Sequence, residues 1–97
     1  MNPFIKGELM RVVITVVGKD RPGILAFVST KCAEYNVNIV DVTQKVLQDL
    51  FTMIMIVEIP EGLELQNFTN DMQGLGEKEG LKIHVMHEGI FNAMHTI

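Results

Sequence analysis

The sequence has little cysteine, few basic residues and no long hydrophobic run, and each of these shortages excludes a class of protein. A single cysteine, Cys32, rules out an internal disulfide and any Cys-x-x-Cys metal or redox site. No apolar run approaches the roughly 20 residues of a membrane-spanning helix, and no charged-then-apolar leader opens the chain. We therefore expect a soluble, cytoplasmic protein that has no membrane partner.

The shortage of basic residues also argues against nucleic acid as a partner. Eight lysines and arginines stand against twelve aspartates and glutamates, which gives a net charge of −4 and a pI of about 5.2. A nucleic-acid-binding protein would present a basic face. The 97 residues fit one domain, and the 47% of apolar residues supply a full core for it.

The most informative segment is the stretch from Val12 to Tyr35. Residues 12–17 are β-branched and apolar at every position but one, which predicts a strand covered on both faces. A turn follows, and from Pro22 to Tyr35 the apolar spacing becomes helical, with a stripe of Ile24, Leu25, Val28, Cys32 and Tyr35.

The turn before this helix is predicted to be a binding site for an anion. We expect Asp20 to cap the helix with its carboxylate, and Pro22 to occupy the first turn. Gly23 has no Cβ, so a ligand can approach the backbone there closely. Free N–H groups at a helix start favour an anion such as a carboxylate.

The rest of the chain adds three strands, a second helix and a tail. Strands are predicted at 38–47, 51–59 and 81–88, and a helix over 65–79 that ends at Gly80. Residues 89–97 are predicted to form a short helical tail with Ile90, Phe91, Met94 and Ile97 on one side. Residues 1–9 stand before the fold, either as an N-terminal extension or as a segment preceding a true start at Met10.

The element order βαββαβ predicts an α+β, ferredoxin-like sandwich. Right-handed crossovers give a four-stranded antiparallel sheet in the order 4-1-3-2, strands numbered along the chain, with both helices on one face. The other face then exposes Val13, Val17 and one row of the third strand, either Ile54 and Ile56 or the alternating methionines. An apolar face of several hundred square ångströms usually marks an interface, so we expect a homodimer. The tail is the alternative cover for this face.

The pattern Val-x-Gly-x-Asp-Arg-Pro-Gly-Ile-Leu at the first turn, followed by Asn36-Val37-Asn38-Ile39, resembles the ACT domain. The resemblance spans residues 10–88. The short chain and its ending His87-Glu88-Gly89-Ile90-Phe91 are similar to a stand-alone single-ACT-domain family related to the glycine cleavage system transcriptional repressor.

The resemblance implies an amino acid held between two copies of the domain. The loop before the first helix supplies contacts, and the asparagine that opens the second strand reaches across the interface. In this chain the implied ligand-binding residues are Asp20, Arg21, Pro22, Gly23, Ile24, Leu25, Asn38 and Ile39. Asp20 stands where several amino-acid binders have asparagine, and a carboxylate there attracts an ammonium group but repels another carboxylate.

Catalysis and metal binding have weaker support in the sequence. Cys32 falls on the buried stripe of the first helix, where a thiol acts as a small hydrophobe. The same element order occurs in acylphosphatases, and Arg21 occupies a comparable loop, but the glycine-rich phosphate cradle of that family is missing. His84 and His87 are three apart on a strand and so point to opposite faces, and His95 lies in the tail.

We therefore expect no catalytic residue, no metal and no cofactor. The sequence favours a regulatory sensor that binds an amino acid or related metabolite at a homodimer interface and acts through an effector protein. The alternative is a dimerisation or docking module that binds no small molecule.

Overall fold

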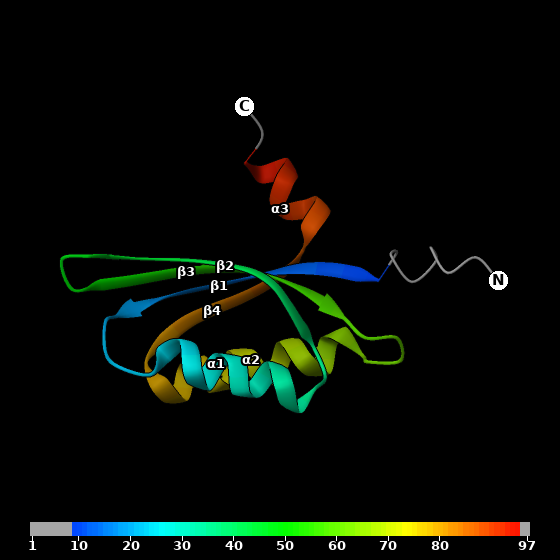
Figure 1. Cartoon of the computed structure of the whole chain (residues 1–97), viewed down its shortest axis with the longest axis horizontal. Helices are drawn as coiled ribbons and strands as arrows, with labels where there is room; N and C mark the ends of the chain where they lie inside the picture. Colours follow the sequence, from blue (N-terminus) through cyan, green and yellow to red (C-terminus); the bar gives the residue numbers. More distant parts are fainter. Residues whose placement is uncertain (1–8, 96–97) are drawn as a thin grey trace.

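The computed structural model describes residues 9–95, and Figure 1 shows its elements. In chain order they are β1 (Met10–Lys19), α1 (Ile24–Glu34), β2 (Asn38–Leu47), β3 (Leu50–Ile59), α2 (Leu65–Glu79), β4 (Leu81–His87) and α3 (Glu88–Met94). The predicted extension over residues 1–9 and the end of the predicted tail fall largely on residues 1–8 and 96–97, which lie outside the described residues.

The sheet has the predicted topology. Its four strands are antiparallel neighbours in the order β2-β3-β1-β4, so the two most apolar strands, β1 and β3, are central. Helices α1 and α2 both lie against one face of the sheet (Figure 1). The prediction of a ferredoxin-like α+β sandwich is confirmed.

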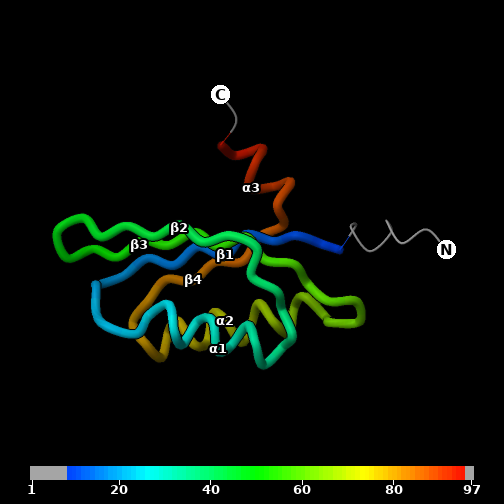
Figure 2. Tube along the Cα trace, viewed as in Figure 1, coloured from blue at the N-terminus to red at the C-terminus, as the bar shows by residue number. Residues whose placement is uncertain are grey.

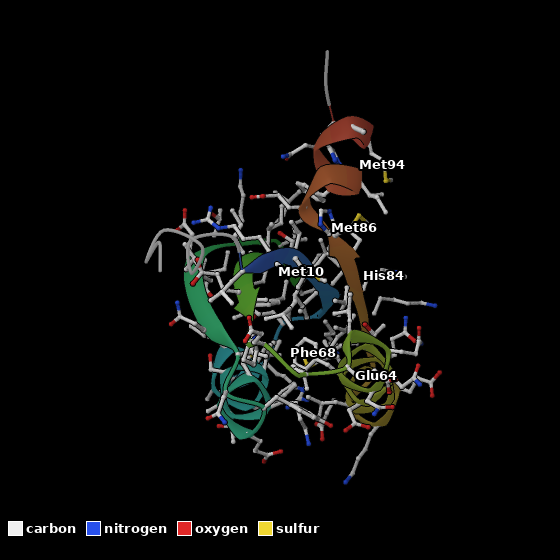
Figure 3. All side chains as sticks on the ribbon, turned by 90° about the vertical axis from the view of Figure 1, so that its right-hand side faces the viewer. Met10, Glu64, Phe68, His84, Met86 and Met94 are labelled. Carbon is white, nitrogen blue, oxygen red and sulfur yellow. The ribbon has the colours of Figure 1, made fainter. Side chains whose placement is uncertain are left out.

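The core lies between this face and the two helices. Every second residue of β1 and β3 points into it, and Tyr35 packs edge-on against Phe68 with ring centroids 5.3 Å apart. Figure 3 shows Phe68 between the sheet and the helices. The most deeply buried side chains that fill this space are Phe68, Ile14, Ile24, Met53, Met55, Met72, Val12, Val16, Val28, Val57 and Cys32.

Helix α1 differs in detail from its prediction. It begins at Ile24 instead of Pro22 and ends at Glu34, and Asn36 follows in the left-handed region at φ 58°. Leu25 was predicted to lie on the buried stripe, but 37% of it is exposed. Phe27 packs against the core in its place. Ile24, Val28 and Cys32 set the face that meets the sheet, and Leu25 lies about 100° around the helix from Ile24, so its side chain points outward.

The second face of the sheet carries neither α1 nor α2, and we call it the open face. Strand register places Val13, Thr15 and Val17 of β1 on it, beside Ile54 and Ile56 of β3. Helix α3 rises from this side, opposite α1 and α2 (Figure 2), and contacts β1 and β4. Val13 is buried, whereas Val17 and Ile54 are exposed. The tail therefore covers one end of the predicted apolar face and leaves the other end bare.

Two glycines of α2 play different roles. Gly76 is buried, and a Cβ at this position would stand 2.7 Å from the carbonyl oxygen of Leu81 and 2.9 Å from Cγ1 of Ile83. Gly74 has nothing within 4 Å of the same position. Gly76 therefore allows α2 to approach β4 closely, while Gly74 only weakens the helix.

We predict opposite effects of alanine at these two positions. Gly76→Ala pushes α2 away from β4 and should lower the free energy of unfolding by about 1–3 kcal/mol, the usual cost of overpacking. Gly74→Ala fills open space and removes backbone freedom from the unfolded chain, so it should raise that free energy by about 0.5–1 kcal/mol. Urea unfolding of both variants measures the difference. Equal effects of the two substitutions would contradict the close approach at Gly76.

Candidate functional site

The loop between β1 and α1 does not have the predicted cap. Gly23 is the N-cap residue, in the left-handed region at φ 88°, and no side chain accepts a hydrogen bond from the first turn of the helix. The prediction that Asp20 caps α1 is therefore wrong. The physical reason is the late start of the helix, which places Asp20 three residues ahead of the N-cap and exposes its side chain.

The missing cap leaves backbone donors available at the start of α1. The first bond of the helix runs from the N–H of Phe27 to the carbonyl oxygen of Gly23, at 3.1 Å. The N–H groups of Ile24, Leu25 and Ala26 precede this bond and have no partner within the helix. A Cβ built on Gly23 would meet nothing within 4 Å, so the space beside these donors is open.

Tertiary contacts hold this loop in place. The N–H of Asp20 donates to the carbonyl oxygen of Asp49 at 2.8 Å, which fastens the loop to the turn between β2 and β3. The guanidinium of Arg21 forms an ion pair with Glu79 at the end of α2. The same guanidinium lies over the ring of Phe27, 5.1 Å from its centroid. Arg21 therefore joins the two helices.

The structure brings some of the predicted ligand residues together and separates others. Asp20, Arg21, Pro22 and Gly23 are all exposed in the loop, next to Ile24, which is buried, and Leu25. Asn38 and Ile39 instead lie at the start of β2, beyond the far end of α1 (Figure 1). The eleven residues of α1 separate the two groups by roughly 16 Å. Within one chain, therefore, they do not form one site.

Asn38 has a local partner. Its amide nitrogen donates to Oε1 of Glu58 on the neighbouring strand at 3.2 Å. Glu58 also lies 3.7 Å from the guanidinium of Arg11. Asn38 is nonetheless exposed, so part of its side chain faces solvent.

Sequence reasoning missed the two residues that fix the loop, Glu79 and Asp49. Glu79 is 58 positions from Arg21, and only the packing of α2 beside α1 brings the two together. Asp49 contributes its backbone carbonyl, a group that every residue has. The sequence carries no signal for either contact beyond the placement of Asp49 in a predicted turn.

The histidines are separated, as their spacing predicts. His84 lies on the open face, and His87 accepts a hydrogen bond on Nδ1 from the N–H of Gly89, which caps α3. His95 stacks on Phe91 with ring centroids 4.2 Å apart. Within residues 9–95 no three side chains of histidine, cysteine, aspartate or glutamate are grouped to hold a metal ion.

Cys32 is fully buried in the core, as its position on the stripe predicts. Burial raises the pKa of the Cys32 thiol to about 11, because the thiolate loses its hydration there. Only the thiolate is a good nucleophile, so this group is inert at neutral pH. Across residues 9–95 no helix is long and apolar enough to span a membrane.

A hollow of about 340 Å³ lies between the two large helices. Its lining comes from α1 and α2 alone and consists of Lys31, Asn70, Asp71, Gly74, Leu75 and Lys78. None of the predicted ligand residues takes part in it. The exposed loop at the start of α1 therefore remains the candidate site.

Comparison with known proteins gives a consistent match along nearly the whole chain. The family model for the ACT domain matches residues 10–86. A UPF0237 protein of Methanosarcina acetivorans is 47% identical over 88 residues, which cover 90% of this chain and 96% of that protein. A UPF0237 protein of Listeria innocua is 47% identical over 89 residues, covering 91% of this chain and all of that protein.

Solved structures give the same result. An ACT domain protein from Streptococcus pneumoniae is 40% identical, with a TM-score of 0.77, and the match covers 91% of this chain and 100% of that chain. A putative glycine cleavage system transcriptional repressor is 25% identical, with a TM-score of 0.74, over 82% of this chain and 46% of that one. The ACT domain named by the family model and by the Streptococcus structure agrees with the resemblance found in the sequence.

The buried thiol predicts a specific loss of stability at alkaline pH. The unfolded thiol ionises near its ordinary pKa of about 8.5, whereas the folded thiol resists ionisation up to about 11. The stability contributed by the neutral thiol is therefore complete below the unfolded pKa and is lost as pH rises toward the folded one.

We expect the unfolding free energy of the wild type to fall by about 2 kcal/mol relative to that of Cys32→Ala between pH 8 and pH 10.5. Urea unfolding at both pH values measures it, and the alanine variant removes the contribution of every other titrating group. A difference that stays constant with pH would contradict the burial of the thiol.

Proposed function

Because the chain belongs to the ACT domain family, we propose that it is a cytoplasmic regulatory sensor that binds an amino acid or related metabolite between two copies. The observation that carries this proposal is the uncapped start of α1 at Gly23. A loop held by two tertiary contacts presents unpartnered helix donors to solvent, beside a residue that has no side chain.

The start of α1 suits the carboxylate of an amino acid. The N–H groups of Ile24, Leu25 and Ala26 point out of the helix start, where the aligned peptide dipoles favour negative charge. Gly23 leaves room for the ligand to approach them, since a Cβ there would occupy the open space. Arg21 adds positive charge at the rim of the loop, although its ion pair with Glu79 partly neutralises it.

The ammonium group of the ligand requires a different partner. Asp20 is exposed and forms no ion pair within residues 9–95, so its carboxylate is available to an ammonium group. Asn38 and Ile39 are too far from Gly23 to act in the same subunit. We place them in the site through a second copy of the chain, in which they face the loop of the first.

A ligand that touches both copies gives the sensor its output. Binding between subunits favours the dimer over the monomer by mass action, and the dimer in turn raises the affinity for the ligand. The signal then passes to an effector protein. We expect the loop to bind and not to catalyse, because its one basic side chain, Arg21, is engaged in the contact between the helices.

A docking module without a small ligand is the second candidate, and the open face favours it. Val17 and Ile54 remain exposed there, and α3 buries none of its residues. Such a surface suits a protein partner regardless of any metabolite. The two candidates differ in whether the loop at Gly23 takes part.

We predict that one or two of the twenty amino acids raise the midpoint of thermal unfolding of the full chain. Gly23→Ala should abolish this ligand-induced rise, because a Cβ beside the free N–H groups blocks the carboxylate. Gly62→Ala is the matched control, since Gly62 has φ 89° against 88° for Gly23 and equally open space. Both variants should lose about 1 kcal/mol of stability from backbone strain alone, and only Gly23→Ala should lose the response.

Asn38→Ala should weaken the same response without straining the backbone. The sensor is refuted if no amino acid shifts the transition, or if Gly23→Ala and Gly62→Ala reduce the shift equally. Absence of any shift, together with a stable complex with one protein partner, would favour the docking module.

A further inference from the structure

We propose that two copies of the chain pair through their open faces, so that α3 of each copy packs on the exposed end of the partner's sheet. This contact goes beyond the proposed function, since it is separate from the ligand site and does not depend on the ligand. It follows from the way in which apolar and charged side chains are distributed on one side of the molecule.

Helix α3 is an apolar arm that contacts β1 and β4 of its own chain but is not buried by them. It begins at Glu88, directly after β4, so no linker allows it to fold down on the sheet. None of its residues is buried, and 56% of Ile90 and 64% of Met94 are exposed. Figure 3 shows Met94 well above the sheet, on the side opposite the two large helices.

The exposed apolar side chains of the open face lie at the end of the sheet away from Glu88, where α3 begins. Val13 is only 1% exposed, and register places it beside Met86 near the end of β4. Farther along the strands, 38% of Val17, 41% of Ile54 and 43% of Leu50 are exposed. Val13 and Val17 are about 13 Å apart along β1, and α3, with seven residues, is only about 10 Å long. The arm therefore does not reach this end within its own chain.

The charged side chains of the open face are also unevenly distributed between the two ends of the strands. Lys19, Lys45 and Lys82 lie at the end that bears Val17, and none of them forms an ion pair within residues 9–95. Asp20 and Asp49 stand in the loops at the same end, so cations outnumber carboxylates there by three to two. We call this the basic end. Asp41, Glu58 and Glu88 lie at the other end, where Arg11 pairs with Glu58 and Glu88. We call this the acidic end.

A two-fold axis between two open faces would cover the exposed apolar end and pair the opposite charges in the same contact. Turning a second copy so that the strands run antiparallel across the interface places each basic end over the partner's acidic end. Since α3 stands at the acidic end, it then meets the partner's exposed Val17, Ile54 and Leu50. Such an interface is isologous, because each copy gives the arm and receives it. In this arrangement the start of α1 at Gly23 lies on the far side of its own sheet from the partner, because α1 covers the face opposite the open face. The ligand contacts proposed above therefore belong to a separate contact between copies.

The arm is tested by sedimentation equilibrium of the full chain without ligand. We expect the wild type to dimerise at micromolar concentration and Ile90→Glu combined with Met94→Glu to weaken the dimer at least tenfold. Val46→Glu is the control, since Val46 is 47% exposed but lies on the opposite face of the sheet, and it should leave the dimer intact. Circular dichroism confirms that each variant is folded, which is expected because α3 contributes no buried residue.

A charge exchange tests the orientation of the two copies. Lys45→Glu with Lys82→Glu makes both ends acidic, and Asp41→Lys with Glu88→Lys makes both ends basic, so each double variant alone should be monomeric. Mixed in equal amounts they should form a heterodimer, because opposite charges then meet at both ends. A misfolded variant would not regain association, so the mixture also controls for folding.

A monomeric wild type, or an arm variant that dimerises as the wild type does, overturns the proposal. So does a pair of folded charge variants that fails to associate on mixing. These outcomes are separate from those of the amino-acid screen. A dimer that survives the arm substitutions while an amino acid still raises the unfolding temperature would remove the docking mode and leave the sensor.

Discussion

The structure depends on a mismatch between two strands and the helices that cover them. β1 and β3 are central and carry apolar side chains on both faces, whereas α1 and α2 cover only one face. Burial of the helix side drives the fold and aligns the strands, because a slip of one residue would exchange the two faces. The other face is left uncovered by α1 and α2, and α3 covers only one end of it, which is the basis of the proposed contact between copies.

The candidate site depends on contacts that connect distant parts of the chain. Asp20 is fastened through its backbone to the turn between β2 and β3, and Arg21 is fastened to the end of α2. These contacts hold the loop while leaving the side chain of Asp20 and the first N–H groups of α1 free. A side-chain cap would have satisfied one or more of the same donors, so the proposed ligand site depends on the absence of that cap.

The candidate site and the open face lie on opposite sides of the sheet. One chain places the Gly23 loop and Asn38 at opposite ends, and it places the apolar arm and the bare apolar surface at opposite ends as well. The proposed contact between open faces closes only the second gap, because α1 covers the other face. In these proposals the ligand and the arm act at two separate contacts between copies.

The sequence by itself determined the element order, the strand order and the identity of the central strands, because apolar periodicity and turn residues act locally. β2 has the predicted bounds, and Gly80 ends α2 in the left-handed region as its chemistry suggests. Tertiary structure alone decided the start of α1, the outward turn of Leu25 and the role of Gly76, since each depends on how closely a helix meets the sheet. It also decided that Asn38 lies far from Gly23, because that distance is set by the length of α1 and the direction of β2. Local propensity fixes which residues form an element, but the free energy of packing fixes where that element begins and what it meets.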